Sequence, residues 1–227
     1  MNRVLKEKDK PLLETAKEQL QSDKGFTLME MLLCVLLSCI VISAIGNFMV
    51  AAIKQYNSVD REINLQIEAQ TVVNQLGKMI KEADNVVFKT EGRDSYAVIY
   101  SDLEKTLETN PDSPAGARIK IVWYHANADT SKPGAMYLFE IEKDSTKYSN
   151  AIAEIKAGTT TNASFMTNYV AGFSLTRSDG TDLNHGLGND KNSVNIKVDL
   201  KNVFKKDKKE YTATDTITLR NKVVQLP

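Results

Sequence analysis

The sequence has little cysteine, histidine, tryptophan or net charge, and each shortage narrows what the chain can do. Its 227 residues include two cysteines, two histidines and one tryptophan, while 29 Lys and Arg balance 29 Asp and Glu. Zero net charge argues against a dedicated nucleic-acid binder, because such proteins need surplus cations to displace counterions from phosphates. His125 and His185 are too few and too scattered to indicate a metal or catalytic cluster.

Signatures of catalysis are missing as well. No nucleophile and base occur at a recognisable spacing, and there is no glycine-rich loop for phosphate. The segment 179–190 is rich in oxygen ligands but lacks the spacing and the closing glutamate of an EF-hand, so we interpret it as a solvated turn, with a Ca²⁺ site as the alternative. We expect no enzymatic activity, no cofactor and no metal site.

The two cysteines, Cys34 and Cys39, lie within one apolar segment. At a separation of five residues on a helix they point about 140° apart, so they cannot bridge each other. We interpret both as small apolar packing residues. The rest of the chain has no cysteine and therefore no disulfide.

That apolar segment is the dominant feature of the sequence. From Phe26 to Ile53 it reads FTLMEMLLCVLLSCIVISAIGNFMVAAI, with Glu30 as its one ionisable side chain. As a helix it would be about 42 Å long, enough to cross the roughly 30 Å hydrocarbon core of a bilayer. Lys and Arg are more numerous near the start of this segment than near its end. This bias predicts that residues 1–25 stay in the cytoplasm and that the chain after the segment is exported. No Ala-x-Ala-like site follows it, so it is not a conventional signal peptide.

The junction before the segment reads Lys-Gly-Phe-Thr-Leu-Met-Glu from Lys24 to Glu30. It resembles the cleavage site of type IV prepilins and type II secretion pseudopilins. The resemblance implies that a prepilin peptidase removes residues 1–25 by cutting after Gly25, and that the new amino group of Phe26 is methylated. It also implies that the subunit then joins other pilin subunits in a filament on the cell surface.

Glu30 is the residue that most needs an explanation. A carboxylate within an apolar segment costs at least about 2 to 3 kcal/mol and requires a partner. The resemblance implies that Glu30 meets the positive N-terminus of a neighbouring subunit and sets the axial register of the filament. The alternative is a carboxylate at the depth of the lipid headgroups.

Two departures from major pilins favour a minor subunit. The sequence has no proline between Pro11 and Pro111, and the leader of 25 residues is long. The short apolar patterns at 120–124, 136–139, 170–175 and 217–221 are similar to the larger minor pilins of the W-type and the pseudopilins of the J-type, which prime and cap the filament. A major pilin remains the alternative. The lack of cysteine after residue 39, with a surface rich in Lys, Asn and Asp, favours a Gram-positive or anaerobic bacterial source.

The remaining chain predicts an α+β fold. Apolar residues at helical spacing after Lys54, without a Pro- or Gly/Ser-rich linker, predict one helix from about Phe26 to about Asp84, with Gly77 as a weak point. Alternating residues predict strands at 86–90, 96–101, 118–124, 135–142, 170–177, 193–200 and 212–220. In the strand 193–200 the alternation predicts one face covered by the helix and one face in water. The expected parts are a leader (1–25), a membrane and filament-core helix (26–53), an amphipathic helix (54–85) and an antiparallel β domain (86–227).

A basic cluster precedes the last strand and comprises Lys201, Lys205, Lys206, Lys208 and Lys209. Because Asp207 and Glu210 interrupt it, we interpret it as a charged hairpin tip between two strands. The alternative is contact with DNA or an anionic surface, as in a tip adhesin or DNA-binding module carried on a pilin stem. A further alternative is an uncleaved single-pass anchor that carries an unrelated domain.

Overall fold

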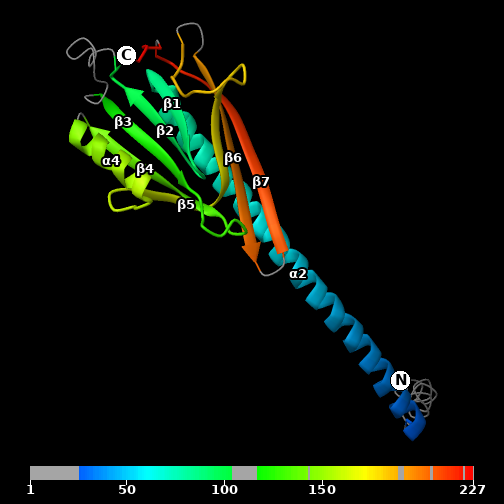
Figure 1. Ribbon diagram of the computed structural model, residues 1–227. Coiled ribbons are helices and arrows are strands. Elements are labelled where there is room, and N and C mark those ends of the chain that lie inside the picture. The colour runs from blue at the N-terminus through cyan, green and yellow to red at the C-terminus, as the bar shows by residue number, and fades with distance from the viewer. Residues whose placement is uncertain are drawn as a thin grey trace, which may run out of the picture. The chain divides into compact units, whose positions relative to one another are not determined.

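The structure, a computed structural model, describes residues 26–103, 117–142, 144–188, 192–204, 207–221 and 223–226. The chain divides into two compact units, residues 1–56 and residues 57–227, which are described separately. Helix α2 (Leu28–Lys81) begins in the first unit and ends in the second (Figure 1). A long apolar helix near the N-terminus, followed by an antiparallel sheet, confirms the predicted α+β class.

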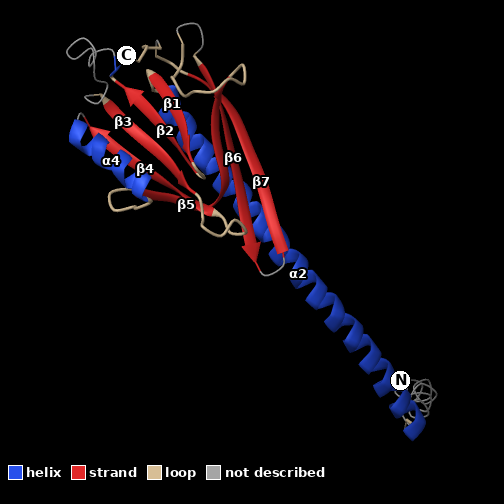
Figure 2. Cartoon of the chain, viewed as in Figure 1, coloured by secondary structure: helices blue, strands red, loops and turns tan. Residues whose placement is uncertain are grey.

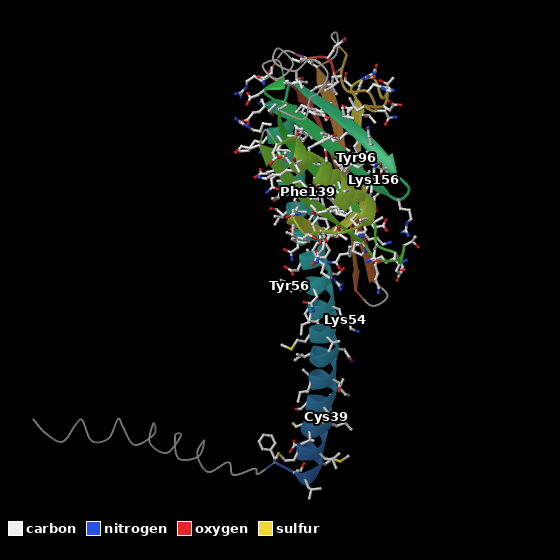
Figure 3. All side chains as sticks on the ribbon, turned by 60° about the vertical axis from the view of Figure 1, so that its left-hand side comes forward. Cys39, Lys54, Tyr56, Tyr96, Phe139 and Lys156 are labelled. Carbon is white, nitrogen blue, oxygen red and sulfur yellow. The ribbon has the colours of Figure 1, made fainter. Side chains whose placement is uncertain are left out.

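In the first unit, every described residue is exposed. Figure 3 shows the side chains between Cys39 and Tyr56 projecting outward from the helix. This part of α2 is long and apolar enough to span a membrane, and none of that window is buried by protein. It suggests a single-pass membrane protein.

The second unit contains one seven-stranded sheet in which each strand pairs antiparallel with the next along the chain (Figures 1 and 2). The strands are β1 (Asn85–Glu91), β2 (Asp94–Ser101), β3 (Arg118–His125), β4 (Gly134–Glu142), β5 (Ser164–Arg177), β6 (Ser193–Phe204) and β7 (Asp207–Thr218). All seven predicted strands are present, although β5 begins six residues earlier than expected and β6 and β7 both reach further towards the turn that joins them.

Two predicted elements end earlier than expected. Helix α2 ends at Lys81, three residues before Asp84, because the backbone N–H of Ala83 turns back to the carbonyl of Ile80. Strand β7 ends at Thr218 rather than Arg220. The N–H of Arg220 donates instead to the carbonyl of Lys81, at 2.8 Å, so the chain leaves the sheet to close on the end of the helix.

One face of the sheet is covered by the second half of α2, as the sequence predicts. Helix residues at helical spacing form one core cluster with the inward residues of β6; the cluster includes Leu65, Ala69, Val72, Leu76, Ile80, Val194, Ile196, Val198 and Leu200. Gly77 does not interrupt the helix. It is buried, and a Cβ placed there would lie 3.1 Å from Cδ1 of Ile217, so this glycine lets α2 approach β7 closely.

The other face carries a helix that the sequence analysis missed, α4 (Ser145–Ala157). Asp144 caps its N-terminus by accepting from the N–H groups of Thr146 and Lys147, and Gly158 ends it at φ 68°. Ala151 and Ile155 pack on this face in a second core cluster that includes Trp123, Phe139, Ile119 and Ile121. Strand β2 is therefore buried on both faces, whereas β6 alternates between core and surface.

Irregular pairing at β5 divides the sheet. The register shifts between β4 and β5 near Met136, and again between β5 and β6 near Ala171. The first half of β5 pairs with β4 and the second half with β6, and the sheet folds over itself at this point. Phe88 and Phe173 meet edge to face at 5.4 Å, and the Ser95 hydroxyl donates to the Phe173 carbonyl at 3.2 Å.

Candidate functional site

The start of α2 holds the first set of predicted site residues. Gly25 lies outside the described residues, and Phe26 is 75% exposed. Thr27 immediately precedes the helix. Its N–H and its hydroxyl donate to Oε2 of Glu30 at 2.9 and 3.1 Å, and the N–H of Glu30 donates to the Thr27 hydroxyl oxygen at 3.3 Å.

These reciprocal bonds form a capping box, in which a threonine and a glutamate three residues later satisfy each other's backbone N–H groups. The carboxylate also lies in the first helical turn, where the helix dipole favours negative charge. Glu30 therefore has local hydrogen-bond partners on its own chain. The Thr-x-x-Glu spacing of a capping box is visible in the sequence from Thr27 to Glu30.

The two cysteines behave as expected. Cys34 and Cys39 are both free thiols on the exposed part of α2. The prediction that they do not bridge each other is confirmed.

The basic cluster lies towards the tip of the β6–β7 hairpin, in line with the predicted charged hairpin tip, but both strands extend further into it than expected. Lys201 lies in β6, and Lys208 and Lys209 lie in β7; the hairpin pairs as far as Phe204 with Asp207. Lys205 and Lys206 lie outside the described residues. Nζ of Lys209 is 3.5 Å from Oε2 of Glu62 on α2, so part of the positive charge is already paired.

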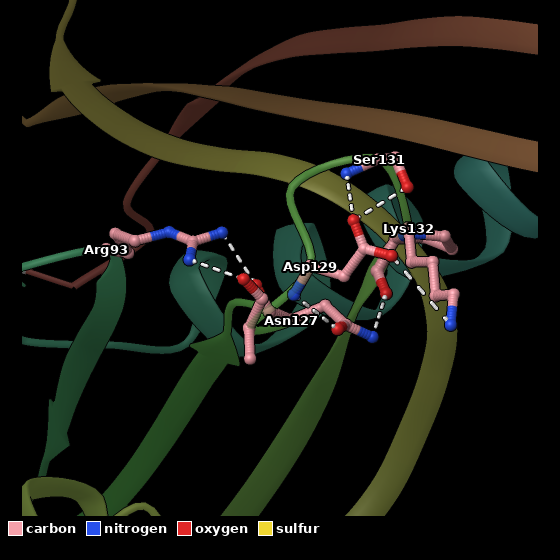
Figure 4. A network of polar contacts seen from close by, with 7 residues as sticks. Arg93, Asn127, Asp129, Ser131 and Lys132 are labelled. Carbon is pink, nitrogen blue, oxygen red and sulfur yellow. Dashed lines mark hydrogen bonds and ion pairs between the residues drawn. The ribbon is translucent and has the colours of Figure 1, made fainter.

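A polar groove of about 540 Å³ lies beside the bulge of β5, and no pattern in the sequence predicts it. One wall is the loop 126–132 between β3 and β4, and the other is formed by residues 199–201 of β6 and 210–212 of β7. Arg93, in the turn between β1 and β2, fastens the loop wall. Its guanidinium donates to the carbonyls of Asn127 and Ala128 at 2.6 and 3.1 Å (Figure 4).

The loop is also held by its own side chains. Oδ1 of Asn127 accepts from the N–H of Asp129 at 3.0 Å, and Nδ2 donates to the carbonyl of Pro133 at 3.3 Å. Oδ1 of Asp129 accepts from the N–H and hydroxyl of Ser131 at 2.9 and 2.7 Å (Figure 4). These bonds to Ser131 are the main reason that the pKa of Asp129 is lowered, and Lys132 and Lys201 lower it further. The loop is thus preformed. Lys201, on the opposite wall of the groove, lies near enough to Asp129 to lower the pKa of its carboxyl group.

Asp94 anchors the start of the same loop. Its carboxylate accepts from the N–H of Ala126 at 2.9 Å and from Nε1 of Trp123 at 3.3 Å, and it lies 2.8 Å from Nδ1 of His125. His125 lines a second hollow, of about 680 Å³, on the other side of the loop. Its role here is to fix the loop.

Tyr124 lies at the base of the groove. Its hydroxyl donates to the carbonyl of Ala171 at 3.1 Å, which ties β3 to the bulge of β5. Burial raises the pKa of the Tyr124 phenol, while the nearby Arg93 acts in the opposite direction. The ring is therefore positioned between the loop wall and the folded sheet.

The described part of the segment 179–190 begins with a tight turn, as predicted, but it is not solvated throughout, because Leu183 and Leu187 are buried in the core cluster. Oδ1 of Asp179 accepts from the N–H and hydroxyl of Thr181 at 3.0 and 2.6 Å, and Gly180 has φ 83°. Asn189 and Asp190 lie outside the described residues. Within the described ranges, no group of three or more His, Cys, Asp or Glu side chains could hold a metal ion.

Comparisons with known proteins give no relative, since no protein-family model, no curated protein and no solved structure matches the chain. Its function must be inferred from the helix, its first turn and the groove.

Proposed function

We propose that the chain is a structural subunit of a type IV pilus or a related secretion filament, cut after Gly25 and assembled through α2. One observation carries this proposal: the first half of α2 exposes apolar side chains on all sides and has a single carboxylate, Glu30, in its first turn. In the same helix, the residues from Leu65 onward enter the core of the β domain.

An exposed apolar surface of this extent requires a cover. Soluble monomers seldom expose contiguous apolar patches above a few hundred Å². A bilayer would cover this helix in the precursor, with residues 1–25 in the cytoplasm and the β domain outside. The apolar helices of neighbouring subunits would cover it in the filament, since contact between helices can replace contact with lipid. Neither step requires α2 to refold.

The capping box supports a role for Glu30 in assembly. Cleavage after Gly25 would create a positive amino group at Phe26, one residue before the cap. Thr27 holds the Glu30 carboxylate at the same end of the helix. A carboxylate there could meet the amino group of an adjacent subunit, and the bonds to Thr27 offset part of the cost of keeping it in apolar surroundings.

We assign the subunit to the minor class, in the complex that primes or caps the filament. The long leader and the absence of proline between Pro11 and Pro111 support this assignment. The β domain, with a helix on each face of its sheet, is also large for a role confined to packing.

The test is to co-express the full chain with a prepilin peptidase and to determine the N-terminus by intact mass and sequencing. We expect loss of residues 1–25 and a methylated Phe26, and Gly25→Val should block the cut. Labelled subunit should then appear in sheared filaments at their ends. An N-terminus still at Met1 in the wild type would rule out the peptidase assignment.

DNA binding by the β6–β7 hairpin is the second candidate function. The register places Lys208 and Lys209 of β7 opposite Val203 and Asn202 of β6. Together with Lys201 of β6, these make three lysines on two adjacent strands. Salt-dependent binding of duplex DNA that is lost in Lys208→Gln/Lys209→Gln would support it. Binding that is unaffected by this double variant would exclude the hairpin.

A further inference from the structure

The groove at the fold of the sheet has the dimensions and the construction of a ligand site. Its volume of about 540 Å³ lies within the roughly 300 to 1,000 Å³ of small-molecule sites. Its loop wall is preformed by Arg93, Asn127 and Asp129, and its base is fixed by the bond from Tyr124 to Ala171. A ligand would therefore not need to order the loop in order to bind.

Two side chains on the wall formed by β6 and β7 have no polar partner among the described residues. Lys201 of β6 and Glu210 of β7 are direct neighbours in the register, and both line the groove. Neither makes a hydrogen bond or an ion pair with another residue of the described ranges. Asp199, by contrast, is engaged by the hydroxyl of Thr212 at 2.6 Å and by Nζ of Lys197 at 3.2 Å. The wall thus presents an ammonium group beside a carboxylate, and neither has a hydrogen bond or ion pair within the part of the chain that the structure describes.

Two tyrosines add aromatic surface to the same groove. Tyr124 and Tyr211 both line it, and both pack against the core cluster between the sheet and α2. Each is half-buried, so each ring is held in place while part of it faces the groove. Such rings combine an apolar face with a hydroxyl that can donate or accept a hydrogen bond.

The charges of the groove select the class of ligand. Arg93, Lys132 and Lys201 are offset by Asp199 and Glu210, so a polyanion such as DNA would meet carboxylates as well as cations. A purely apolar ligand would leave these groups without partners. A neutral molecule with many hydroxyl groups satisfies both donors and acceptors, and its C–H faces suit the tyrosine rings.

We propose that this groove binds a short neutral oligosaccharide, with Tyr124 and Tyr211 against the sugar faces and with Lys201 and Glu210 bonded to sugar hydroxyls. Arg93 supports the loop wall with two of its five N–H donors and retains the others for a sugar oxygen. The site does not depend on the proposed filament function. Loss of sugar binding and loss of assembly are separate measurements.

The experiment uses the full chain in phosphocholine micelles, because many common detergents carry sugar headgroups. Binding of maltotriose, cellotriose and N-acetylchitotriose is measured by titration calorimetry. We expect at least one trisaccharide to bind. Tyr211→Ala should weaken it by about tenfold or more, whereas Tyr211→Phe should keep most of the affinity. Lys201→Met and Glu210→Gln should each weaken binding several-fold.

Lys156→Met, on the exposed side of α4, is the matched control and should bind as the wild type does. Unchanged fluorescence of Trp123 will show that each variant is folded. If Tyr211→Ala does not fold, the Lys201 and Glu210 variants still test the proposal. The proposal is wrong if none of the three sugars binds, or if the folded groove variants bind like the wild type. Displacement of a bound trisaccharide by oligo-dT would also overturn it, since it would show an anionic ligand in the groove.

Discussion

Asn85, at the start of β1, accepts a hydrogen bond at 2.8 Å from the backbone N–H of Leu187, 102 positions later in the chain. Its side chain is fully buried, and its Nδ2 donates to the carbonyl of Val224 at 2.7 Å. One amide thus joins the start of β1, the loop after β5 and the C-terminal segment.

Asn85→Ala should lower the free energy of unfolding by about 2 to 3 kcal/mol, because it leaves the buried N–H of Leu187 and the partly buried carbonyl of Val224 without this partner. Denaturation followed by the fluorescence of Trp123, the single and fully buried tryptophan, measures this change. Asn64→Ala is the control, since Asn64 is exposed and bonds only to Asp60 within one helix turn. Equal stability of the two variants would contradict the role assigned to Asn85.

Gly186→Ala should destabilise the protein through the same contact. Gly186 has φ 76°, and a Cβ there would lie 2.6 Å from Oδ1 of Asn85. Gly92 has a similar φ of 64° but open space around it, so Gly92→Ala isolates the backbone strain of about 1 kcal/mol. We expect Gly186→Ala to cost at least about 1 kcal/mol more than Gly92→Ala in the same denaturation assay. If the two substitutions cost the same, the packing of Gly186 on Asn85 does not matter.

Glu30→Ala should leave cleavage after Gly25 intact but reduce incorporation into filaments several-fold, because it removes the carboxylate that we propose meets the amino group of a neighbouring subunit. Thr27→Ala should give a weaker defect of the same kind, since it removes the cap and frees the carboxylate to rotate. Thr27→Ser, which keeps the hydroxyl, should assemble normally. The measurement is the ratio of filament to membrane subunit in sheared fractions. Wild-type assembly by Glu30→Ala would refute the register role.

Alkaline pH should destabilise the β domain in part through Tyr96. Burial, followed by the charge of Glu91, raises the pKa of Tyr96 to about 12 from its ordinary 10.0. The unfolded state therefore loses this proton first. The stabilisation is complete below about pH 10 and is lost as the pH rises through about 12. Burial raises the pKa of Tyr100 as well, so Tyr96→Phe should remove only part of the decline.

Unfolding free energies measured from pH 9 to 12 test this expectation. The stability of Tyr96→Phe should fall less steeply than that of the wild type above about pH 10. Tyr56→Phe, at an exposed position, should follow the wild-type curve. Identical slopes for all three proteins would show that Tyr96 does not couple ionisation to folding.

The elements that the sequence predicted well are those with a local pattern. Alternation of Val194, Ile196 and Val198 with polar residues marks β6, and the apolar spacing from Leu65 to Ile80 marks the buried face of α2. Helix α4 could also have been predicted. Asp144 and Gly158 bracket it, and Tyr148, Ala151, Ile152 and Ile155 recur at helical spacing between them.

The groove could not have been predicted in this way. Arg93 reaches Asn127 across 34 positions, and Lys201 of β6 lies 74 residues after Asn127. Their meeting depends on bulges near Met136 and Ala171 that fold the sheet at β5, and neither residue type requires a bulge. Tertiary packing, rather than local preference, determines the site.

The closure of the C-terminal segment on the end of α2 has a mechanical consequence. Arg220 and Asn221 bond to the carbonyls of Lys81 and Glu82, and Val224 bonds to the carbonyl of Asp84. Tension along this part of α2 would act on these bonds and on the buried helix side chains from Leu65 to Ile80 at the same time. The contacts would therefore be loaded in parallel and would not break one after another. The β domain is therefore built to bear a pull on its helix without unravelling from its C-terminus.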